Sequence, residues 1–124
     1  MELTVKQMIQ AHAALVELKR REMTYAMARQ VRQWSTACRK ELQGVFEHEQ
    51  LLMERYGGSR KENKEITFPT PEQASEFYEE RERMMQTAVY VDLEKIDMSG
   101  LQKKLFLKAE YFELLEPICN FEGV

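Results

Sequence analysis

With 124 residues, 44% hydrophobic and 31% charged, the chain is long enough to bury one helical core, and we predict a single domain over residues 1–124. Its formal net charge of −3 lacks the basic excess that nucleic-acid-binding domains usually carry. No apolar run approaches the roughly 18 residues of a membrane span and no signal peptide is evident, so we expect no membrane association and a cytoplasmic protein. In that compartment Cys38 and Cys119 should stay reduced.

A first helix is predicted over residues 5–19. Thr4 and Gln7 have the spacing of a capping box, in which a hydroxyl and an amide each satisfy a free backbone N–H. His12 falls within the apolar stripe that follows, so we expect a hydrogen-bonded residue at the edge of the core rather than a catalyst. The charged stretch 19–24 predicts a short break, because one continuous helix of about 50 residues would be unusual in a domain of this size.

The second predicted helix, residues 23–56, carries the strongest pattern of the chain. Its apolar residues form two rows with an 11-residue spacing, Met23, Trp34, Val45 and Tyr56 in one and Val31, Leu42 and Met53 in the other. Because 11 residues make almost three whole turns, each row stays on one side of the helix. The helix should end at Gly57 and Gly58, where glycine adopts the left-handed conformation. We expect the other helices to cover these rows, which makes this helix the internal spine of the domain.

The remaining chain predicts two short strands and two helices. Residues 57–64 are typical of an exposed loop, 65–68 alternate like a strand, and Thr70, Pro71 and Gln73 predict a capped helix over 71–86. The best strand pattern follows at 88–93, and we expect the segments 66–68 and 89–93 to pair with each other.

A third capping box, Ser99 to Gln102, predicts the start of the last helix, which Pro117 ends. Its inward residues should be Leu101, Leu105, Phe112 and Leu115. The fold class is therefore mainly α (α+β): four helices, one of them long and central, with a small two-stranded antiparallel sheet.

No pattern in the sequence predicts an enzyme, a metal site or a cofactor. His48 lies between two glutamates without a second metal ligand four residues away, and we interpret it as a solvated polar side chain. Cys38 takes an inward position, where a thiol is protonated and inert. Gly57 and Gly58 follow a helix instead of preceding one, so they gain no helix N-terminus for binding an anion.

Charge along the second helix changes sign. Its first half is basic and its second half holds Glu41, Glu47, Glu49 and Glu54, an order that opposes the helix dipole. Three interpretations compete: a solvated face paired with acids of the later helices, a surface for an acidic protein or for antiparallel self-pairing, and a surface for nucleic-acid phosphates. The inward positions of Trp34 and Tyr56 disfavour the third, because single-strand binders expose aromatic residues. The predicted partner-binding residues are Arg21, Arg29, Arg32, Arg39 and Lys40.

The layout resembles short proteins that are encoded by tailed phages and prophages and grouped in families of unknown function. The residues that carry this resemblance are Glu54, Tyr56, Gly57 and Gly58, then Ile66 and Phe68, then Val89, Val91 and Leu93, and last Leu114, Leu115, Pro117 and Ile118. It implies a phage or prophage origin and transfers no catalytic residue.

From these observations we expect a non-enzymatic phage or prophage accessory protein that binds another protein. The partner is a phage protein in an assembly or a host protein that the chain inhibits, and a homodimer is also compatible with the charge pattern. The alternative is a nucleic-acid-associated accessory protein that uses the basic half of the long helix. The expected location is the cytoplasm of the bacterial host, or the virion.

Overall fold

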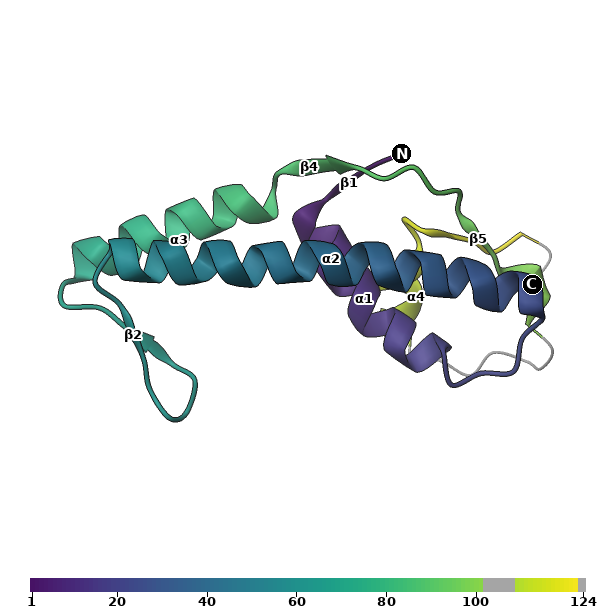
Figure 1. Cartoon of the computed structure of the whole chain (residues 1–124), viewed down its shortest axis with the longest axis horizontal. Coiled ribbons are helices and arrows are strands. Elements are labelled where there is room, and N and C mark those ends of the chain that lie inside the picture. Colours follow the sequence, from purple (N-terminus) through teal and green to yellow (C-terminus); the bar gives the residue numbers. More distant parts are fainter. Residues whose placement is uncertain (102–108, 123–124) are drawn as a thin grey trace.

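A computed structural model describes residues 1–101 and 109–122 of the chain. Within these residues the fold is mainly α-helical with small β elements, as the sequence predicted (Figure 1). The α-helices are α1 (Val5–Leu18), α2 (Tyr25–Arg55), α3 (Pro71–Met85) and α4 (Ala109–Leu115), and a 3₁₀ turn, η1, covers Met98–Gly100. The strands are β1 (Glu2–Thr4), β2 (Ser59–Arg60), β3 (Ile66–Thr67), β4 (Ala88–Tyr90), β5 (Ile96–Asp97) and β6 (Cys119–Asn120).

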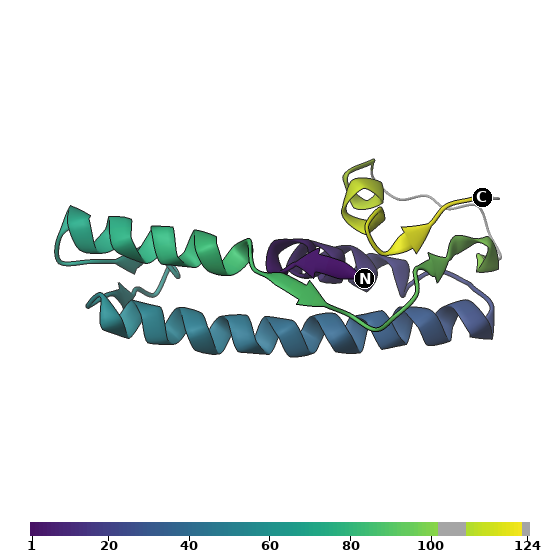
Figure 2. The same cartoon turned by 90° about the horizontal axis from the view of Figure 1, so that it is seen from above.

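The long helix α2 forms one layer by itself. Figure 2 shows α1 and α3 on one side of it, with α4 beyond α1, while the stretch that follows β4 passes across α2 on its way to β5. Contacts between elements agree, since α2 packs against α1 and α3 while α4 packs against α1. The described elements therefore leave the other side of α2 uncovered.

The apolar rows of α2 face the second layer, as predicted. Val31, Trp34, Val45 and Met53 are buried, and Leu42 and Tyr56 are half-buried. Trp34 is anchored from its polar edge, because its indole N–H donates to the carbonyl oxygen of Glu94 at 2.8 Å. The prediction of an inner face on one long helix is thus confirmed, although Met23 lies outside α2.

The ends of the first two helices follow the local sequence. Thr4 and Gln7 form the predicted capping box, with N–O distances of 3.1 Å and 2.8 Å. The predicted break is present, and Thr24 caps α2 through the backbone N–H of Met27. At the other end Gly57 has φ of +71°, and the N–H of Gly58 donates to the carbonyl of Met53 at 2.8 Å, which closes the helix in a Schellman motif.

The predicted strand pairing is wrong. β3 pairs with β2, within the segment predicted to be a loop, and β4 pairs with β1 in the register Leu3↔Val89. The two predicted partners stand at opposite ends of α3, whose 15 residues span about 22 Å, so they cannot meet. β1 has only three residues before the cap of α1, too few to show an alternating pattern.

The predicted start of the last helix is also wrong. Leu101 is extended, with φ −66° and ψ 128°, and forms a β-bridge with Met23. Asp97 rather than Ser99 provides the cap here, and it caps η1. The backbone at Gly100 is held because its carbonyl accepts the N–H of Thr24 at 2.8 Å. The predicted residues Gln102 and Leu105 lie outside the described residues, whereas Leu115 is buried and α4 ends before Pro117, as expected.

Candidate functional site

The uncovered side of α2 is the surface on which the predicted partner-binding residues gather. We call it the outer face, and its exposed members are Arg29, Arg32, Thr36, Arg39, Lys40, Gln43, Glu47, Gln50 and Glu54. Apart from the neighbours Arg39 and Lys40 they recur at intervals of three and four residues, so they form one stripe along the helix. The stripe lies opposite the buried residues Val31, Trp34 and Val45, and its edge residues Arg29, Thr36 and Lys40 line hollows beside the segment from β4 to η1. The structure thus places four of the five predicted residues on a single surface.

Arg21 is the exception, since it lies in the link between α1 and α2. It is exposed, and with Lys19 and Arg32 it lines a hollow of about 570 Å³ at this end of the molecule. Met23, Ala28 and Val31 provide the apolar wall of the hollow. Because Arg32 belongs to both the hollow and the outer face, Arg21 lies near one end of the outer face without being part of it.

The outer-face bases form no close ion pair within the described part of the chain. Among the described residues, none of Arg29, Arg32, Arg39 and Lys40 forms an ion pair within 4.0 Å. The interpretation that they pair with acids of the later helices is wrong for this part of the chain. The physical reason is placement: α3, with its five glutamates, lies beside the second half of α2 and not beside the basic half (Figure 1).

The acids of α2 divide into two groups. Glu49 points inward, where its carboxylate accepts hydrogen bonds from Arg60 and Arg81, each at 3.0 Å. Glu47 and Glu54 are exposed on the outer face and, among the described residues, hydrogen-bond only to glutamine amides of the same helix, at 3.5 Å and 3.4 Å. The outer face therefore carries positive charge in its first half and negative charge in its second, neither held in a close ion pair by described residues.

Positive charge also accumulates at the edge where α1 packs against α2. Burial lowers the pKa of His12 below its ordinary value of 6.5, and the charges of Lys19 and Arg39 lower it further. His12 is half-buried, as expected for the edge of the core, but among the described residues it has no hydrogen-bond partner. A neutral His12 thus borders the basic half of the outer face at neutral pH.

Three large apolar side chains of α2 are exposed, and sequence reasoning missed them. Tyr25, Phe46 and Leu51 have exposed fractions of 75%, 64% and 58%. None of the three belongs to the two 11-residue rows, and this could have indicated from the sequence that they do not face the core. Exposed apolar side chains beside unpaired charges are typical of surfaces that bind another protein.

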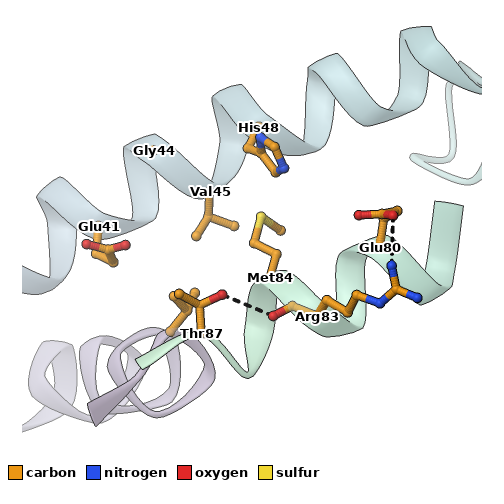
Figure 3. A pocket seen from close by; sticks show the side chains of 9 residues that line it. Glu41, Gly44, Val45, His48, Glu80, Arg83, Met84 and Thr87 are labelled. Atoms are coloured by element: carbon orange, nitrogen blue, oxygen red, sulfur yellow. Dashed lines mark hydrogen bonds and ion pairs between the residues drawn. The ribbon is translucent and has the colours of Figure 1, made fainter. Parts of the chain in front are cut away.

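A groove between α2 and α3 is the arrangement closest to a catalytic site. It has a volume of about 470 Å³, and Figure 3 shows Glu41 and His48 on one wall and Glu80, Arg83 and Met84 on the other. Glu80 is bound to Arg83 at 3.0 Å, and Thr87 donates to the carbonyl of Arg83 at 3.1 Å. No described residue hydrogen-bonds the exposed His48 imidazole, so no acid–base pair is assembled there.

Other reactive groups are separate and shielded. Cys38 and Cys119 are buried, and burial raises the pKa of the first thiol to about 11 and of the second to about 12. In the parts of the chain that the structure describes, His, Cys, Asp and Glu side chains do not cluster in threes as metal ligands would. None of the described helices combines the length and apolar character needed to cross a membrane.

Comparison of the chain with protein families, curated proteins and solved structures finds no significant match. The resemblance to phage and prophage proteins therefore stays a prediction. The feature that bears on function is the outer face, with charges that form no close ion pair among the described residues.

Proposed function

We propose that this chain is a non-enzymatic protein-binding component of a tailed phage or prophage, acting in the cytoplasm of the bacterial host or on the virion. It takes part in phage assembly or binds and inhibits a host protein. The outer face of α2 is the binding surface, with Arg29, Arg32, Arg39 and Lys40 as its cationic contacts and Arg21 at its end.

The observation that carries this proposal is the absence of intramolecular partners for these four bases among the described residues. An acidic partner surface would supply the ion pairs that the described residues do not. Exposed Tyr25 and Phe46 provide apolar contact area beside the charges.

The test is affinity capture with the tagged chain from bacterial lysates that lack the chain itself, so that self-association contributes no signal. Wild type is compared with a variant in which Arg29, Arg32, Arg39 and Lys40 are all changed to Glu. The matched control is Lys61→Glu with Lys64→Glu, which reverses exposed charges on the β2–β3 hairpin. We expect proteins that wild type and the control retain and the quadruple variant loses. Equal retention by all three chains contradicts the proposal.

A second candidate function is contact with nucleic acid, and one observation favours it. Tyr25 is 75% exposed and lies one turn from Arg29, which puts an aromatic ring beside the basic half of the outer face. Binding of this kind weakens steeply with salt, by about one logarithmic unit per phosphate contact for each tenfold increase. A gel-shift series at two salt concentrations, with Tyr25→Ala as the variant, separates this function from protein binding.

A further inference from the structure

We infer that the outer face of α2 pairs with the outer face of a second copy of this chain, in an antiparallel dimer whose two-fold axis passes by Gln43. This inference rests on the proposed function, because it names a partner for the same surface. The two copies interact through complementary halves, the basic half of one against the acidic half of the other.

Charge order along the stripe sets both the direction and the register. Arg39 and Glu47 lie one turn on either side of Gln43, and Arg32 and Glu54 lie three turns on either side. An antiparallel copy centred on Gln43 therefore brings its Glu47 opposite Arg39 and its Glu54 opposite Arg32. Parallel pairing would instead place like charges against each other, which costs free energy.

None of these four side chains has a competing ion pair within the described part of its own chain. The inward Glu49, by contrast, is held by Arg60 and Arg81 and takes no part. The available acids are thus the two that the register needs. Two-fold symmetry repeats each Arg–Glu pair, so Arg32, Arg39, Glu47 and Glu54 are paired in both copies, whereas Arg29 and Lys40 are not.

The first test is sedimentation of the full chain at rising concentration in about 0.1 M and about 1 M salt, where charges are screened beyond roughly 10 Å and 3 Å. We expect a dimer at low salt that becomes a monomer at high salt. Two variants make the test specific: Arg32→Glu with Arg39→Glu, and Glu47→Lys with Glu54→Lys. Each alone should be monomeric, and an equimolar mixture of the two should form a heterodimer. If each folded variant is monomeric and the mixture stays so too, the inference is wrong.

Disulfide trapping tests the register. Gln43→Cys lies beside the proposed axis and should link two copies under mild oxidation, whereas Thr36→Cys, on the same face, lies about 20 Å from its symmetry mate and should not. Burial and the raised pKa values keep Cys38 and Cys119 from competing. Equal trapping at both positions overturns the register, and a monomer under every condition overturns the dimer. Capture from lysates that lack the chain is unaffected by either result, so failure of the dimer is distinguishable from failure of protein binding.

Discussion

Glu49 joins three parts of the fold, and its removal should loosen two of them. Its carboxylate binds Arg60 of β2 at 3.0 Å and Arg81 of α3 at 3.0 Å, and the Glu49 side chain is only 13% exposed. Glu49→Gln keeps the shape and removes the charge. The amide offers one oxygen, so it can accept from one arginine while its NH₂ group faces the other.

The two bonds set the size of the expected effect. Hydrogen bonds to charged groups contribute about 1.5–3 kcal/mol, whereas fully exposed ion pairs contribute about 0.2–1 kcal/mol. The arginines are 41% and 39% exposed while their acceptor is mostly buried, so each bond falls between these ranges, near 1 kcal/mol. We expect Glu49→Gln to lower the free energy of unfolding by about 1–2 kcal/mol and Tm by roughly 4–8 °C.

Urea unfolding followed by circular dichroism measures this loss, and Glu47→Gln is the matched control because Glu47 is exposed and forms no ion pair with a described residue. Double-mutant cycles with Arg60→Ala and Arg81→Ala then divide the loss between the hairpin and α3. A loss below about 0.3 kcal/mol, or an equal loss in Glu47→Gln, refutes the reasoning.

Three further predictions concern single side chains. Gly58→Ala should lower the free energy of unfolding, measured in urea, by about 1–3 kcal/mol, because the new Cβ would lie 2.6 Å from the Phe68 ring. Gly44→Ala should raise it by about 1 kcal/mol, because a Cβ at Gly44 meets nothing within 4 Å. A change of the same sign for both substitutions contradicts this account. Ser35→Ala should raise the free energy of unfolding by about 1 kcal/mol, because the buried hydroxyl has no described hydrogen-bond partner; a measured decrease would show that a partner exists. The folded pKa of His12 lies below 6.5, so the unfolded chain binds more protons than the folded chain as pH falls. Wild type should therefore lose stability below about pH 6.5 relative to His12→Gln, with His48→Gln as the control. If the free energies of unfolding of wild type and His12→Gln run parallel between about pH 7 and 5, His12 makes no such contribution.

Local signals in the sequence predicted the helices well. The capping residues Thr4 and Thr70 and the closing glycine Gly57 act within one turn of the chain, so their effect does not depend on distant residues. The inner face of α2 was equally predictable from the sequence, because residues spaced by 11 lie on one side of a helix whatever packs against it. The same reasoning located the outer-face bases, since residues off the rows of one long helix must point elsewhere.

The pairing of strands that are distant in the chain could not be predicted from the sequence. β1 and β4 are three residues each, and their contact depends on where α1 and α3 put them. The start of the last helix failed for a related reason: Leu101 has a helical context in sequence, but the bridge to Met23 and the bond between Thr24 and Gly100 hold this backbone extended. Tertiary contacts outweigh local propensity at such places.

Periodicity and charge order predict from the sequence that α2 has a covered side and a charged side, because both are properties of one helix. The tertiary structure sets which charges remain available. It draws Glu49 inward to Arg60 and Arg81, leaves Glu47 and Glu54 exposed, and places α3 too far along the helix to neutralise Arg29, Arg32 and Arg39. Ion pairing depends on distances of a few ångströms between segments far apart in the chain, and those distances exist only after the helices have packed.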